Sequence, residues 1–188
     1  GGRWYPADTR APGTGFFQNG PGTPPLGTGS FRLNTPDAAS KVQLFTDLYD
    51  GVRLADITGI GYSTYKDPIS ADGPATTALN LRVDLTGDGI PDAYMVFEPY
   101  QDQGNAAIVE GVWQNWDAYR GGAALWWLNT GVPACSQATP CTWNQILAIV
   151  PNATIEEGPN CGPGGVTVPC PGSLGLNQGS GNPDTYTN

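Results

Sequence analysis

The chain contains no histidine in its 188 residues. Histidine is the usual proton shuttle near neutral pH and a common transition-metal ligand, so its absence excludes Ser-His-Asp and Cys-His catalysis and zinc sites built from histidine. Charged residues are also scarce, at 13% of the chain against about 25% in ordinary soluble proteins. Three classes of protein remain: a binding module, a structural subunit, or an enzyme that uses carboxylates alone.

Basic residues and long hydrophobic runs are scarce as well. Eight Lys and Arg stand against 17 Asp and Glu, which gives a net charge of −9. This balance repels nucleic-acid phosphates and anionic lipid. The longest apolar runs, at 123–128 and 146–150, are far shorter than the ~20 residues of a membrane helix. We therefore expect no nucleic-acid partner and no membrane insertion.

Four cysteines form two pairs that are close in sequence, Cys135 with Cys141 and Cys161 with Cys170. No CxxC zinc spacing occurs. Four cysteines allow three connectivities, and local pairing is the natural one across these short loops. We predict two small disulfides, and hence an oxidising location, extracellular or at the cell surface.

The chain is rich in turn-forming residues, with 27 glycines and 18 prolines. Turn signals recur about every ten residues between β-branched or aromatic runs, as is typical of an all-β antiparallel sandwich. The clearest strand is 79–85, where apolar and polar residues alternate. Residues 41–49 and 59–65 are predicted as strands, with Asp50-Gly51 as a hairpin turn. Further strands are predicted at 93–98, 108–116, 123–129, 153–156 and 173–177, about nine in all.

One short helix is predicted near 143–150. Thr142-Trp143-Asn144-Gln145 matches the capping box, and an apolar stripe follows it. Pro151 is expected to end the helix.

The sequence divides into an N-terminal arm at 1–19, a Gly/Pro-rich connection at 20–30 and a sandwich domain at 31–188. The arm carries four large apolar residues, Trp4, Tyr5, Phe16 and Phe17. It is either a strand donated to a neighbouring molecule or the first strand of its own domain.

The segment from 84 to 92 has the oxygen spacing of the first part of a calcium loop. Its candidate ligands are Asp84, Thr86, Asp88, the carbonyl of Ile90 and Asp92. The twelfth position is Met95 instead of Glu, so the loop is not an EF-hand. Calcium is therefore a predicted cofactor, and a plain Gly-Asp-Gly hairpin is the alternative.

Carboxylates and aromatic residues supply the remaining candidates. Glycosidase chemistry needs two flanking carboxyl groups, and the candidates are Glu98, Glu110, Asp117 and Glu156. Their spacing selects no pair, so we predict no enzymatic activity. A sugar-stacking platform could form from Trp113, Trp116, Trp126 and Trp127. The alternative is that these tryptophans pack in the core. Trp126 and Trp127 are adjacent in a predicted strand, so they must face opposite sides of it.

Several motifs together resemble a family of secreted bacterial domains with no assigned activity. They are the Gly-Pro-Gly-Thr-Pro-Pro connection at 20–25, Tyr-Ser-Thr-Tyr at 62–65, Trp-Gln-Asn-Trp-Asp-Ala at 113–118, the 83–99 segment that ends in Val-Phe-Glu-Pro, the pair Trp126-Trp127, Pro-Asn-Ala-Thr-Ile at 151–155, and 177–183. The resemblance covers 16–188. It implies a sandwich of jelly-roll type and brings no catalytic residues.

Domains of this family usually continue beyond the point that corresponds to Asn188, with the last strands of the sheet. A sandwich without those strands exposes unpaired backbone groups and apolar core, which another chain can cover by strand addition. We therefore predict a structural subunit that binds copies of itself head to tail in an extracellular filament or surface layer. The alternative is an extracellular carbohydrate-binding module with polysaccharide as its partner.

Overall fold

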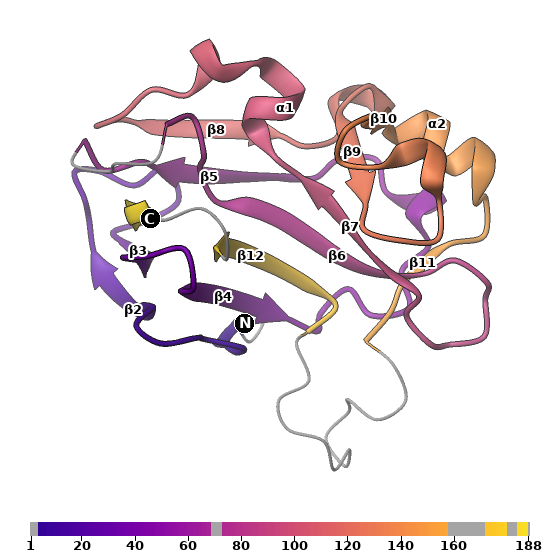
Figure 1. The fold of residues 1–188 in the computed structure, drawn as a ribbon, viewed down its shortest axis with the longest axis horizontal. Coiled ribbons are helices and arrows are strands. Elements are labelled where there is room, and N and C mark those ends of the chain that lie inside the picture. Colours follow the sequence, from indigo (N-terminus) through magenta and orange to yellow (C-terminus); the bar gives the residue numbers. More distant parts are fainter. Residues whose placement is uncertain (1–3, 69–72, 158–171, 180–183, 188) are drawn as a thin grey trace.

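The computed structural model describes residues 4–68, 73–157, 172–179 and 184–187. The described chain is an all-β antiparallel sandwich (Figure 1), as the sequence predicts. Its helices are short. They are α1 (Pro99–Gln103), α2 (Trp143–Ile149) and the 3-10 turns η1 (Leu54–Asp56), η2 (Asn105–Ala107), η3 (Arg120–Gly122) and η4 (Pro133–Cys135). No helix in the described ranges is long and apolar enough to cross a membrane.

The first layer is an eight-stranded sheet. Seven strands lie in the order β1 (Tyr5–Pro6), β4 (Lys41–Thr46), β12 (Leu174–Gly179), β6 (Ala78–Asp84), β7 (Ala93–Phe97), β9 (Leu125–Leu128) and β10 (Cys141–Thr142). The eighth, β11 (Thr154–Ile155), pairs with β6. β6 and β7 pair antiparallel, and they correspond to the strands that the sequence predicts at 79–85 and 93–98.

The second layer consists of two separate pieces. One has the order β13 (Asp184–Thr187), β3 (Gly29–Thr35) and β2 (Thr14–Asn19), and the other pairs β5 (Gly61–Tyr65) with β8 (Trp113–Asp117). Figure 1 shows β5 and β8 along one side of the molecule and β2 and β3 on the other, with β6, β12 and β4 between them in this view. The chain crosses between layers from β3 to β4, from β4 to β5 and from β5 to β6, as in a jelly roll.

The core lies between the layers. Its main cluster includes Trp126, Trp143 and Ile146, which are fully buried, and a smaller cluster forms around Phe31 and Leu33. Helix α2 begins with the predicted capping box. The Thr142 hydroxyl accepts the Gln145 N–H at 3.2 Å, and the Gln145 side chain accepts the Thr142 N–H at 2.8 Å.

Two sequence predictions of strand pairing are wrong. β4 and β5 do not form a hairpin at Asp50-Gly51, because β4 pairs with β1 and β12 while β5 pairs with β8. The chain instead crosses between layers through η1, where buried Leu54 anchors it. The strand predicted at 108–116 begins only at Trp113, because Gly111 has φ +75° and turns the chain just before it.

The N-terminal arm pairs within its own domain. Tyr5 lies opposite Phe45 in β4, and β2 pairs with β3 from Thr14 to Asn19. The predicted connection at 20–30 is therefore mainly the loop of the β2–β3 hairpin. Of the two alternatives left by the sequence, the structure describes the arm as strands of its own sandwich.

The first predicted disulfide is confirmed. Cys135 and Cys141 are bonded, with their Cα atoms 5.1 Å apart. The predicted pair Cys161 and Cys170 lies outside the described residues.

Candidate functional site

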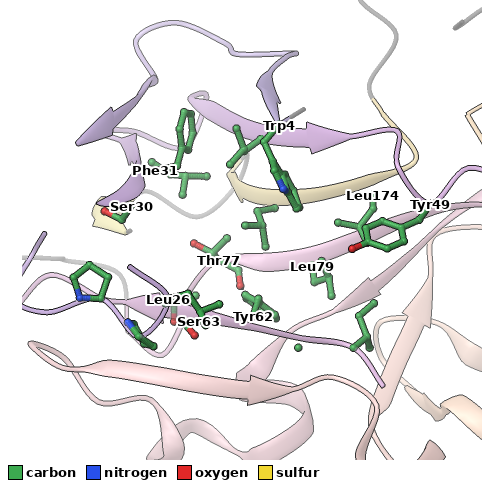
Figure 2. A pocket seen from close by; sticks show the side chains of 18 of the residues that line it. Trp4, Leu26, Ser30, Phe31, Tyr49, Tyr62, Ser63, Thr77, Leu79 and Leu174 are labelled. Atoms are coloured by element: carbon green, nitrogen blue, oxygen red, sulfur yellow. The ribbon is translucent and has the colours of Figure 1, made fainter. Parts of the chain in front are cut away.

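A large apolar groove separates the two pieces of the second layer (Figure 2). Its volume is about 1280 Å³, which exceeds the roughly 300–1,000 Å³ of small-ligand pockets. Its lining comes from β2, β3, β5, β8 and the loops beside them, over a floor formed by the first layer. Leu26 is 91% exposed and Phe17 62% exposed at its margin. Exposed apolar surface of this kind marks interaction sites.

The floor of the groove is a row of leucines that crosses the eight-stranded sheet. Leu44 of β4 lies opposite Leu176 of β12, and Leu176 lies opposite Leu79 of β6. Leu174 and Ile155 extend this apolar lining. Asp56 is the one Asp, Glu, Lys or Arg among the lining residues that the structure describes. The groove therefore favours an uncharged, apolar occupant.

One wall of the groove is the edge of β3. The Gly20 N–H donates to the Thr28 carbonyl at 3.0 Å, which fixes the phase of the β2–β3 ladder. By antiparallel alternation, the backbone groups of Gly29, Phe31 and Leu33 point away from β2. Leu33 lies opposite Thr187 of β13, the last residue of that strand. Within the described ranges, the outward groups of Gly29 and Phe31 have no ladder partner.

The opposite wall is the edge of β5. The Ala118 N–H donates to the Ile60 carbonyl at 2.9 Å, so even-numbered residues of β5 bond to β8. Gly61 and Ser63 therefore direct their backbone groups away from β8. Among the described strands, β5 pairs with β8 alone.

Tyr62 closes the inner end of this wall. Its hydroxyl donates to the Thr77 carbonyl at 2.8 Å. Burial raises the pKa of this hydroxyl well above its usual value, and the nearby Glu98 and Asp102 carboxylates add to the rise. Tyr62 is thus a fixed neutral side chain in the lining.

The opposite face of the eight-stranded sheet carries a smaller, polar hollow of about 540 Å³. The same strands form this hollow. Their residues that are adjacent in sequence to the leucines of the groove line it, because the side chains of neighbouring residues point to opposite faces of the sheet. Its lining is Arg10, Lys41, Gln43, Thr76, Ala78, Asn80, Tyr94, Val96, Glu98, Trp127, Asn129, Gln137, Asn177, Gln178 and Gly179.

Glu98 organises one end of the polar hollow. It is 9% exposed, and its Oε2 accepts hydrogen bonds from the Trp127 indole at 2.8 Å and Gln101 at 2.9 Å. The Tyr100 hydroxyl lies at 3.3 Å and the Gln137 amide at 3.4 Å from the same oxygen. This carboxylate holds Trp127 and Gln137 in place.

Asp8 organises the other end of the hollow. It accepts hydrogen bonds from Lys41 at 2.9 Å and Gln43 at 2.8 Å, and Arg10 lies at 3.4 Å. Burial by itself would raise the pKa of Asp8, but Lys41 and Arg10 outweigh it and lower the pKa below its usual value. Both cations of the hollow thus face a carboxylate.

The four tryptophans proposed as a platform do not form one surface. Trp116 is 4% exposed and Trp126 is fully buried, so both belong to the core. The half-buried pair separates: Trp113 lines the groove and Trp127 lines the hollow. The sequence did predict that Trp126 and Trp127 face opposite sides of their strand. It did not indicate the amides beside Trp127, although the alternation in 79–85 already places Asn80 opposite the leucines.

The aromatic residues of the N-terminal arm lie near the groove or in the β2–β3 hairpin. Trp4 and Phe17 line the groove, Tyr5 pairs with Phe45, and Phe16 is 47% exposed. These residues therefore contribute to the accepting surface of their own chain. Their predicted role in an assembly interface stays a prediction.

The predicted calcium ligands form a loop closed by its own backbone. Asp84 is 2% exposed and accepts the N–H groups of Thr86, Gly87 and Gly89 at 2.8, 2.6 and 2.7 Å. Burial would raise the pKa of Asp84, but these donors outweigh it and lower the pKa.

The other oxygens of this loop are used in the same way. Asp92 accepts the Leu85 N–H and Asp88 accepts the Ile90 N–H, while Thr86 lies 3.3 Å from Asp84. This pattern matches the plain-hairpin alternative. No cluster of three or more metal-ligating side chains occurs within the described ranges. Calcium binding stays a prediction.

The candidate acids are not gathered in one cavity. Glu98 alone of the four lines the polar hollow. The Asp117 carboxylate accepts the N–H groups of Tyr119 and Arg120, and Glu110, which is exposed, lies opposite Lys66 in an isolated parallel β-bridge of the backbone. Glu156 follows β11 and donates its N–H to the Arg82 carbonyl.

Comparison with known protein families, curated proteins and solved structures finds no significant match. The resemblance to secreted bacterial domains therefore stays a prediction. What the coordinates define is an all-β antiparallel sandwich with an apolar groove on one side of its main sheet and a polar hollow on the other.

Proposed function

We propose that this domain is a strand-accepting structural subunit of an extracellular assembly. An extended segment of a neighbouring polypeptide lies in the apolar groove and joins β3 to β5. The observation that carries this proposal is the coincidence of an apolar floor with two strand edges at which the outward backbone groups of Gly29 and Phe31, and of Gly61 and Ser63, have no ladder partner in the described chain. Strand addition to exposed edges is a common mode of peptide recognition.

The geometry specifies the chemistry of the segment. Backbone groups on both of its edges would pair with Phe31 on one side and Ser63 on the other. Because side chains alternate across a strand, every second residue would face the leucine floor and should be apolar. The flanking strands are seven and five residues long, so a segment of similar length fits. The lining offers no cation for an acidic segment.

The donor differs from the one first considered. The N-terminal arm occupies β1 and β2 of its own sandwich, so donation would require it to leave both positions. The proposed segment instead comes from another part of a neighbouring chain. A second copy as that neighbour, and a head-to-tail filament, stay predictions of the sequence.

A backbone-specific variant tests the proposal. The probe is a synthetic six-residue strand of alternating valine and threonine with a lysine at each end, and the readout is amide hydrogen exchange. The peptide should slow exchange at Phe31 and Ser63. Ser63→Pro removes one outward N–H but leaves the β5–β8 ladder intact, since proline is tolerated at a free edge. It should weaken peptide binding at least tenfold.

Ser63→Ala is the matched control. It loses the same hydroxyl contact to Asn115 but keeps the N–H, so it should bind the peptide like the native protein. Equal binding by the proline and alanine variants would contradict strand addition.

Sedimentation of the protein alone tests whether the neighbour is a second copy of this chain. A monomer at every concentration contradicts that partner.

A further inference from the structure

The polar hollow runs across the strands instead of along them. Two rows of paired residues form its floor, Asn80–Val96–Trp127 and Gln43–Asn177–Ala78. From β4 to β9 there are four strand spacings, or ~19 Å at ~4.8 Å each. The hollow is therefore long enough for a chain of several units.

Trp127 supplies a fixed aromatic wall at one end. It is half-buried, and its N–H is already satisfied by Glu98 at 2.8 Å. Tyr94, which lies two residues from Val96 on the same face of β7, is half-buried beside it. Burial raises the pKa of the Tyr94 hydroxyl, an effect that Arg82 reduces and Asp8 increases. The ring of Trp127 is thus held before any ligand arrives, which reduces the entropy cost of binding.

The floor contains hydrogen-bond acceptors that have no donor among the described residues. The side-chain oxygens of Asn80 and Asn177 are buried and have no hydrogen-bond partner among the described residues. The Asn177 amide nitrogen is already engaged with the Gly179 carbonyl at 2.9 Å. Buried polar atoms without partners are unusual and costly. Both side chains are half-buried, so a small rotation of either amide brings its oxygen to the surface of the hollow, where a ligand hydroxyl that donates to it removes that cost.

The charges of the hollow favour a neutral ligand. Lys41 and Arg10 both face Asp8, and Glu98 faces four donors. Among the lining residues that the structure describes, no cation is left to select a uronic acid or phosphate. From these contacts we infer that the hollow binds a neutral oligosaccharide, which stacks the C–H face of one sugar on Trp127 and donates hydroxyls to Asn80 and Asn177.

The site is suited to binding and not to hydrolysis. Glycosidases place two carboxyl groups on either side of the scissile bond. Of the carboxylates in the described residues, Glu98 alone lines the hollow, and its four hydrogen bonds assign it to positioning Trp127 and Gln137. Glu98→Gln should hold the Trp127 ring less firmly, and the resulting change in tryptophan fluorescence should be absent when Trp127 is also replaced by alanine.

Titration calorimetry with a panel of hexasaccharides tests the inference. The panel contains β-linked hexamers of glucose, xylose and mannose, with hexagalacturonic acid as the charged comparison. At least one neutral hexamer should bind, and the uronic acid should not. Trp127→Ala should weaken that binding at least tenfold, with melting curves confirming the fold of the variant.

Trp113→Ala is the matched control, because this tryptophan is also half-buried but lines the groove. It should bind the hexasaccharide like the native protein. Absence of binding to every neutral hexamer, or equal losses in the two tryptophan variants, would overturn the assignment. Failure of the groove proposal leaves this result unaffected, since none of the described residues lines both sites.

Discussion

The groove and the hollow are two faces of the same three strands. Leu44, Leu176 and Leu79 line the groove, and the residues next to each of them in sequence, Gln43, Asn177 and Asn80, line the hollow. Period-two alternation alone separates an apolar surface from an amide-rich one. Beside the groove, backbone groups at two strand edges have no partner in the described chain, whereas the hollow contains buried oxygens without donors.

The largest expected difference between the two faces lies in adjacent positions of β6. Leu79→Ala removes a side chain that is 3% exposed in the core, so the free energy of unfolding should fall by about 2–5 kcal/mol. Asn80→Leu removes a buried oxygen that has no partner, so the free energy of unfolding should change by less than about 1 kcal/mol. Urea unfolding measures both.

Hexasaccharide binding should rank the same two variants in the opposite order from their stability. Where Leu79→Ala remains folded, it should bind the neutral hexasaccharide normally, while Asn80→Leu should not. Similar losses of stability in both would show that the faces of β6 are not distinct.

The alternation in β6 is also why part of this architecture could be predicted from the sequence. Local signals were sufficient for β6 and β7, for the capped helix at Thr142 and for the Cys135–Cys141 bond. Each depends on residues close together in the chain. The sequence also placed Trp126 and Trp127 on opposite sides of one strand.

The rest of the architecture depends on which strands pair with one another. The spacing of residues along the chain does not determine that pairing. Asp50-Gly51 has the chemistry of a hairpin turn, yet the chain crosses there to the other layer because Leu54 is buried in the core. The groove exists because β3 and β5, which are far apart in sequence, border one gap. The hollow could not be predicted from the sequence, because it depends on the strand register that places Asn177 opposite Gln43.

The pH dependence of the free energy of unfolding gives a second way to distinguish the stability of the fold from binding at the groove and the hollow. Glu157 lines neither site and is 6% exposed. Burial raises its pKa to about 7, and Asp50 and Asp47 add to the rise. The unfolded chain therefore releases this proton at lower pH than the native protein. The contribution of this proton to the free energy of unfolding is ~3 kcal/mol. It is fully present below about pH 4.5 and is lost by about pH 7.

Glu157→Gln keeps a neutral side chain at every pH. The free energy of unfolding of the native protein should fall between pH 5 and pH 8, and that of the variant should fall much less. Hexasaccharide and peptide binding should stay constant in the variant over this range. Parallel curves for the two proteins would remove Glu157 as the cause.

The disulfide should have a small effect on binding, and this effect should be confined to one of the two sites. The Cys135–Cys141 bond spans six positions, so its loss should lower the free energy of unfolding by ~2 kcal/mol on the chain-entropy account. Its loop carries Gln137, which lines the hollow and contacts Glu98 at 3.4 Å. The double variant Cys135→Ala with Cys141→Ala should therefore weaken hexasaccharide binding a few-fold. Because no residue of this loop lines the groove, peptide binding should not change, and an equal loss at both sites would mean that the disulfide acts through the whole sandwich.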